Sequence, residues 1–106
     1  ILFEHGFRLS IKERLSDDMG RVAIEAYGYE MWRDAEKISW YDAQPHPDVP
    51  ELQATFPHHK HIAPDIKHHR IPAPGMSFDH PNLPQLIMEI ETILAGIVDE
   101  QVERPD

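Results

Sequence analysis

The distribution of proline limits what this chain can fold into more than any other feature. Eight of the ten prolines fall within residues 42–81, at positions 45, 47, 50, 57, 64, 72, 74 and 81. Proline has no N–H donor and disfavours helix in the residue before it, so we predict an extended loop over this range. A loop of that length is usually functional or disordered. Apolar anchors along it favour an ordered loop: Phe56, Ile62, Ile66, Ile71 and Phe78.

Strand patterns precede this loop. Apolar and polar residues alternate over residues 1–12, which is the period-two signature of a half-buried strand. Residues 21–32 are rich in β-branched and aromatic side chains, and residues 37–41 alternate again, so we predict two further strands. A turn is expected over residues 16–20. The three strands suggest an antiparallel meander, and we expect His5 to be a hydrogen-bonded core residue on the apolar face of the first strand.

A helical repeat follows the loop. Apolar residues recur at helical spacing over residues 82–98, which predicts an amphipathic helix. Asn82 and Gln85 resemble a capping box at its start. We therefore predict a single α+β domain. It has a small antiparallel sheet over residues 1–41, the long Pro/His-rich loop over residues 42–81, and a C-terminal amphipathic helix packed on one face of the sheet.

The size and charge of the chain exclude several classes of protein. Its 106 residues suit one small domain that buries a modest fraction of its surface, so we expect a partner or a homodimer to contribute to stability. The formal net charge of -9 disfavours general nucleic-acid binding, so any contact with phosphate has to be local. The absence of cysteine excludes disulfides and fits a reducing cytosol. No apolar run reaches membrane-spanning length.

Histidine is concentrated in the predicted loop. Seven of the eight histidines lie between residues 46 and 80, and the most regular group is His58, His59 and His61. Imidazole titrates near neutral pH and binds divalent metals, so this group indicates proton transfer or metal binding. In an extended segment His59 and His61 share one face, while His58 points the other way with Lys60.

Metal binding is one interpretation of the group. A His-x-His pair on a strand can chelate a divalent cation, so we consider a site for zinc or another divalent metal made of His59, His61 and His46, or of the pair with His80. A carboxylate ligand is also expected, but no spacing distinguishes one among Asp42, Asp48, Asp65 and Asp79.

Acid–base cleavage of RNA is the second interpretation. One imidazole takes the proton of a 2′-hydroxyl, another protonates the leaving oxygen, and a Lys or Arg stabilises the charge on the phosphate. Residues 56–70 contain three Lys or Arg and one Asp, so the stretch is locally basic within an acidic chain. Asp42 ends the last predicted strand, where its carboxylate can orient a histidine. Aromatic side chains near the loop, Trp40 and Tyr41, could stack on a nucleobase.

The third interpretation assigns no chemistry to these residues. Imidazoles in a proline-rich loop can form hydrogen bonds with backbone groups that have no partner in a sheet. This role, or simple exposure to solvent, explains His68, His69 and His80 without any chemistry. Core packing is the default for aromatic residues on strands. The chain is then a non-catalytic interaction module, in which the loop organises the fold and the helix binds a partner.

Two blocks of sequence resemble the TumE family of small prokaryotic proteins, which are described as toxins of type II toxin–antitoxin systems. The first block is Trp40-Tyr41-Asp42-Ala43-Gln44-Pro45-His46-Pro47, and the second and more specific one is Thr55-Phe56-Pro57-His58-His59-Lys60-His61. The order of the strands and the C-terminal helix also fits, so the resemblance extends over most of the chain. The chain departs from the family pattern at Gln44, where asparagine is expected, and at His46-Pro47, which replaces a longer Pro-His-His-Pro.

The resemblance implies a cytoplasmic toxin that is neutralised by a partner antitoxin, typically a helix-turn-helix protein. It also implies a further helix and strand before Ile1, so we expect an N-terminal segment to be missing from this sequence. Together with the residues, it predicts a toxin that acts on RNA by metal-independent, histidine-based cleavage. The predicted catalytic residues are His58, His59, His61, Lys60 and Asp42. The predicted substrate-binding residues are Arg70, Lys67, Tyr41, Trp40 and His46.

Overall fold

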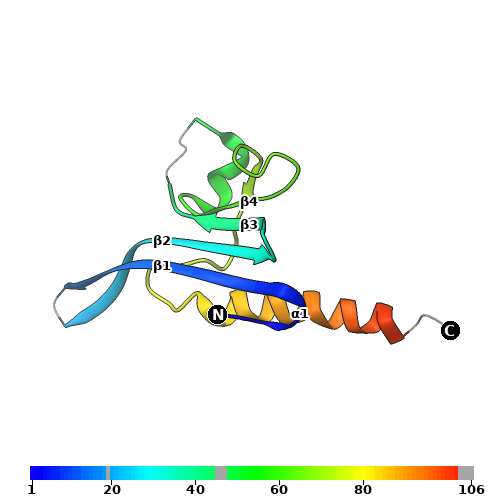
Figure 1. Ribbon diagram of the computed structural model, residues 1–106. Coiled ribbons are helices and arrows are strands. Elements are labelled where there is room, and N and C mark those ends of the chain that lie inside the picture. Colours follow the sequence, from blue (N-terminus) through cyan, green and yellow to red (C-terminus); the bar gives the residue numbers. More distant parts are fainter. Residues whose placement is uncertain (19, 45–47, 103–106) are drawn as a thin grey trace.

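The chain folds into one sheet and one long helix (Figure 1). The computed structural model describes residues 1–18, 20–44 and 48–102. The elements are η1 (Glu4–Gly6), β1 (Phe7–Asp18), β2 (Arg21–Arg33), β3 (Glu36–Asp42), η2 (Pro50–Thr55), β4 (His59–His61), β5 (Arg70–Pro72) and α1 (Leu83–Val102), where η marks a 3-10 turn. The strands pair antiparallel in the order β1-β2-β3-β4-β5, which confirms the predicted α+β class. None of the described helices combines the length and the apolar character needed to cross a membrane.

The first strand begins later than predicted. β1 starts at Phe7 because His5 and Gly6 adopt φ angles of 60° and 80°, which interrupt an extended strand. The carbonyl of Gly6 instead accepts a hydrogen bond of 2.8 Å from the N–H of Asp34, in the turn between β2 and β3. The predicted place of His5 in the core is wrong, because this turn leaves it exposed.

The turn and the loop predicted from the sequence are both too long. β1 continues to Asp18, which pairs with Arg21, so the strand includes most of the turn expected over residues 16–20. The range predicted as a loop, residues 42–81, contains η2 and the two short strands β4 and β5. β5 lies at the edge of the sheet, where a proline such as Pro72 is tolerated because one side of the strand needs no partner.

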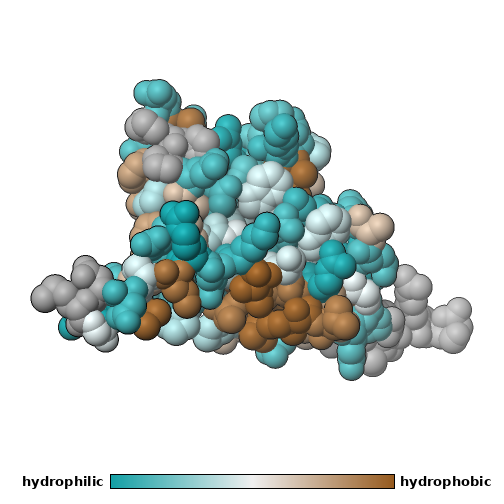
Figure 2. Space-filling model, turned by 60° about the vertical axis from the view of Figure 1, so that its left-hand side comes forward, coloured by the Kyte–Doolittle hydropathy of each residue, from teal (hydrophilic) through white to brown (hydrophobic). Residues whose placement is uncertain are grey.

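The two faces of the sheet differ in what covers them. One face packs against α1, and its fully buried side chains, together with those of the helix, include Leu9, Tyr29, Leu86 and Ile90. The helix thus covers a single face, as its apolar stripe predicts. Figure 2 shows apolar side chains gathered low in the view, at the level of β1 and α1, and mainly polar ones above them. The opposite face, called the open face below, carries the alternate strand residues, among them Ser10, Lys12, Gly28, Glu30, Trp40 and Asp42.

Asn82 connects the start of α1 to the sheet. Its side chain is buried, and its amide nitrogen donates to the Tyr29 hydroxyl at 3.1 Å and to the Ser77 carbonyl at 2.9 Å. Its amide oxygen accepts from the Ser77 N–H at 2.9 Å. The side chain of Gln85 donates to the Pro74 carbonyl at 3.2 Å. The predicted capping box is therefore wrong, because both side chains bind the segment before the helix.

Replacing Asn82 tests this connection. Asn82→Ala should lower the free energy of unfolding by about 1–3 kcal/mol, because buried polar groups of Tyr29 and Ser77 lose their partner. Urea denaturation measures the change. Glu91→Ala, at an exposed position of α1, is the control and should change the free energy by less than about 0.5 kcal/mol. Equal stability of the two variants would contradict the role of Asn82.

Candidate functional site

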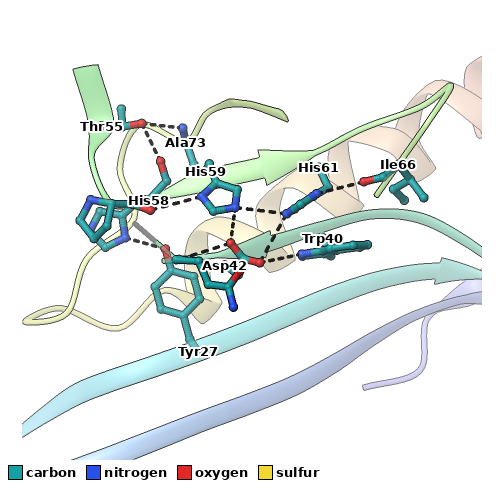
Figure 3. A network of polar contacts seen from close by, with 11 residues as sticks. Tyr27, Trp40, Asp42, Thr55, His58, His59, His61, Ile66 and Ala73 are labelled. Atoms are coloured by element: carbon teal, nitrogen blue, oxygen red, sulfur yellow. Dashed lines mark hydrogen bonds and ion pairs between the residues drawn. The ribbon is translucent and has the colours of Figure 1, made fainter. Parts of the chain in front are cut away.

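The register of β3 and β4 brings three of the predicted site residues together. Asp42 lies opposite His59, and Trp40 lies opposite His61. Residues that are opposite in an antiparallel pair share a face, and every second residue of a strand returns to that face. Asp42, His59 and His61 therefore converge on the open face, and Figure 3 shows both imidazoles directed at the carboxylate. These three residues are called the Asp–His cluster below.

Both imidazole rings of the cluster turn their Nε2 atoms toward Asp42. The Nε2 atom of His59 contacts Oδ1 of Asp42, and that of His61 lies 3.4 Å from Oδ2. The two Nε2 atoms are 3.1 Å apart. Each Nδ1 atom faces a backbone carbonyl, 3.3 Å away at Pro57 for His59 and 3.0 Å away at Ile66 for His61. Because a carbonyl only accepts, each Nδ1 carries a hydrogen, and a neutral ring has its lone pair on Nε2.

The cluster is buried on the histidine side and accessible on the carboxylate side. His59 and His61 are 1% and 4% exposed, whereas the Asp42 side chain is 19% exposed. Burial lowers the pKa of His61, although the neighbouring Asp42 carboxylate acts in the opposite direction. One ligand atom from each residue lies within 4.8 Å of the others. Such a group can share protons among its members or hold a cation.

Trp40 supports the Asp42 carboxylate. Its indole Nε1 donates to Oδ2 of Asp42 at 3.1 Å. The indole ring stacks on the imidazole of His61 with centroids 3.8 Å apart, and the ammonium of Lys37 lies 4.6 Å from the centre of the same ring. The indole N–H thus orients the carboxylate, while the indole ring packs against His61. Trp40 is therefore a positioning residue beside the cluster. Its stacking on a nucleobase stays a prediction.

A groove of about 450 Å³ lies on the open face and reaches Asp42. Small residues of β2, Ala26 and Gly28, line it together with Lys12 and Glu30. A Cβ atom added at Gly28 would meet no atom within 4 Å, so the space above this strand is open. Sequence reasoning missed the groove. A glycine inside a strand was the available signal, because it often marks a close approach of a ligand or another backbone.

Basic residues lie near the cluster and the groove. Arg70 is opposite His61 in the β4–β5 pair, so both residues belong to the open face. Lys12 lines the groove. Lys67 is exposed in the segment between β4 and β5. Another predicted binding residue, His46, lies outside the described residues.

His58, Lys60 and Tyr41 turn away from the cluster. Nδ1 of His58 lies 2.5 Å from the hydroxyl of Tyr27, with the two rings parallel, and burial lowers the pKa of His58. The ammonium of Lys60 lies 2.5 Å from the carboxylate of Glu89 in α1, which also accepts from the Tyr41 hydroxyl at 2.8 Å. The structure therefore divides the predicted catalytic residues between two faces, and Lys60 and Tyr41 join the sheet to the helix.

One protein family model matches most of the chain. The family model described as Toxin TumE matches residues 1–99, which include every strand, the Asp–His cluster and most of α1. The chain belongs to the TumE toxin family. Neither the curated proteins nor the solved structures gave a match to it. Family membership supports the coarse prediction of a toxin of a toxin–antitoxin system, which has an antitoxin as its partner.

The ring state of His61 in this TumE protein can be measured directly. Long-range ¹H–¹⁵N spectra at neutral pH should show a neutral ring with its hydrogen on Nδ1. The Ile66 carbonyl accepts from that nitrogen, and burial lowers the pKa of His61. Loss of one signal in His61→Ala gives the assignment, and the exposed His5 serves as the reference ring. A His61 ring with its hydrogen on Nε2 would contradict the described geometry.

Proposed function

We propose that this chain is a toxin that cleaves RNA at the Asp–His cluster. The observation that carries the proposal is the meeting of the cluster with the groove on the open face. The groove makes Asp42 accessible to a substrate, while His59 and His61 stay buried behind it. Buried titratable groups that converge at a cleft are typical of sites that move protons.

The reaction we propose is transesterification at a phosphodiester of RNA. The 2′-hydroxyl gives its proton to the cluster, and its oxygen bonds to the phosphorus. The 5′-oxygen then leaves with a proton that the cluster returns. These steps balance without an oxidant or a reductant. His59 and His61 are the candidate groups that hold the proton, on the Nε2 atoms that face Asp42, and Asp42 is the member of the cluster that lines the groove.

Charge on the open face supports a phosphate substrate. The chain has a net charge of -9, which keeps RNA from most of its surface. Arg8 and Lys37, by contrast, both lie over the ring of Trp32, at 5.0 and 5.4 Å from its centre, and Lys37 also pairs with Glu30 at 2.6 Å. Lys12 lines the groove, and Arg70 shares the face with His61. Cations placed beside the reacting phosphate would stabilise the charge that develops on it.

The identity of the partner stays part of the proposal. We expect the antitoxin to be a helix-turn-helix protein that is present with the toxin in the cytoplasm. A homodimer of the chain also stays a prediction. Binding of the antitoxin over the groove would explain neutralisation, because it would separate RNA from the cluster.

RNA cleavage by the purified chain tests the proposal. The wild-type protein, freed of antitoxin, should cleave single-stranded RNA, and His59→Ala should reduce the rate at least about 100-fold, as expected for loss of a group that transfers a proton. His68→Ala, at an exposed histidine, is the matched control and should cleave like the wild type. Thermal unfolding shows whether His59→Ala is folded. Intact RNA after incubation with the wild-type protein would refute RNA cleavage.

A side chain at position 28 tests the groove separately from the cluster. Gly28→Leu should keep the fold, because a Cβ atom there would meet no atom within 4 Å, and should weaken RNA binding at least about 10-fold by filling the groove. Gly96→Leu adds the same atoms to α1 at another position without neighbours within 4 Å, and RNA binding should be unchanged. Fluorescence anisotropy with labelled RNA measures both. Equal affinity for the two variants would place the RNA elsewhere.

A further inference from the structure

The geometry points to a divalent-metal site formed by Asp42, His59 and His61, with zinc as the best fit. The sequence left metal binding open beside metal-independent cleavage, and the structure supplies reasons to prefer the metal. The inference rests on the proposed function only for the role of the metal in cleavage. Binding itself can be tested without RNA.

The first reason is the direction of the donor atoms. Both Nδ1 atoms face backbone carbonyls, so both Nε2 lone pairs point toward the same carboxylate. Three electron-rich groups that converge in this way repel one another unless a positive charge lies between them. Histidines that bind metals almost always donate their other ring N–H to a carbonyl or a carboxylate. His59 and His61 both have this arrangement.

The second reason is the spacing of the donor atoms. Zinc binds imidazole nitrogen at ~2.0 Å, so two ligands of a tetrahedral site are roughly 3.3 Å apart. The two Nε2 atoms are 3.1 Å apart, and His61 Nε2 lies 3.4 Å from Oδ2 of Asp42. One shared proton would bring only two donor atoms together. The third pair, Nε2 of His59 and Oδ1 of Asp42, is in direct contact and so closer than two ligands of one ion, which means that Asp42 would bind the cation through Oδ2.

The same spacing disfavours cleavage by two imidazoles alone. The base and the acid of that mechanism act on oxygens at opposite sides of one phosphorus atom, and so need room between them for a phosphate group. The Nε2 atoms of His59 and His61 are in direct contact, and the remaining histidine of the predicted set, His58, is engaged with Tyr27. A metal held by the cluster would ease this difficulty, because its positive charge would stabilise the charge that develops on the phosphate without a second imidazole.

The ligand set also limits which metal fits. Two imidazoles and one carboxylate suit zinc and similar divalent transition metals, whereas magnesium and calcium prefer oxygen ligands only. Three protein ligands leave a fourth position for water, which is the pattern of catalytic rather than structural zinc. Asp42 lines the groove, so the open position would face the substrate. A zinc ion held by these residues would supply a bound water of lowered pKa, which could accept the 2′-hydroxyl proton beside the groove.

Titration of the untagged protein with zinc is the decisive experiment. Wild-type protein, dialysed against a chelator, should bind one zinc per chain in calorimetry, and zinc should raise its Tm. Magnesium should do neither. His59→Ala and Asp42→Asn should lose stoichiometric binding, and His68→Ala should keep it. His68 is the matched control because it forms an exposed pair with Asp65 at 3.1 Å that has no place in the cluster.

A milder variant and a spectrum keep the test decisive if those variants fail to fold. Trp40→Phe removes the hydrogen bond to Asp42 and should weaken zinc binding about 10-fold or more, as loss of an outer-shell partner does. In the wild type, zinc should shift the ¹⁵N signals of His59 and His61 and leave that of His68 in place. Absence of stoichiometric zinc binding, or shifts confined to His68, would overturn the inference.

The two proposals fail in different ways. Zinc bound at the cluster without RNA cleavage would refute only the proposed function. RNA cleavage that persists in EDTA by a protein that binds no zinc would refute only the metal site and favour the imidazole mechanism.

Discussion

The pairing of β4 with β3 is the interaction on which the rest of the site depends. β4 is only three residues long, yet its register sets Asp42 opposite His59 and Trp40 opposite His61. The same alternation sends Lys60 to the other face, where it meets Glu89 of α1. Neighbouring residues of this short strand therefore have different roles on the two faces of the sheet. His59 and His61 face Asp42 on the open face, and Lys60 connects the sheet to the helix.

Each residue of the cluster is oriented by a further polar group, as is common in metal and proton-transfer sites. Asp42 receives the imidazoles of His59 and His61 and is itself held by the indole N–H of Trp40. The histidines are oriented in turn by the carbonyls of Pro57 and Ile66, which come from the segments on either side of β4. The proline-rich segment therefore does more than connect strands, because its backbone fixes which ring nitrogen carries the hydrogen.

Several features of the fold and the site were accessible from the sequence because they depend on local pattern. The strands, the amphipathic helix and the shared face of His59 and His61 follow from residue periodicity, which the backbone geometry imposes. The interruption at His5 and Gly6 was not accessible, since the alternation of apolar residues continues through it. Nor was β5, because its three residues pair with β4, which is equally short, and three residues are too few to show a periodic pattern.

The sequence by itself determined the fold class, the toxin family and the pair of histidines that face one way, because short-range periodicity and a specific motif carry that information. Only the tertiary structure decided which carboxylate joins the pair. As metal ligands, four aspartates had equal claims in the sequence, which singled out Asp42 only as a carboxylate that could orient a histidine, and strand register places Asp42 beside the pair. It also decided that His58 bonds to Tyr27 and that Gly28 leaves a groove open beside Asp42. These choices depend on contacts between distant strands, which local pattern does not encode.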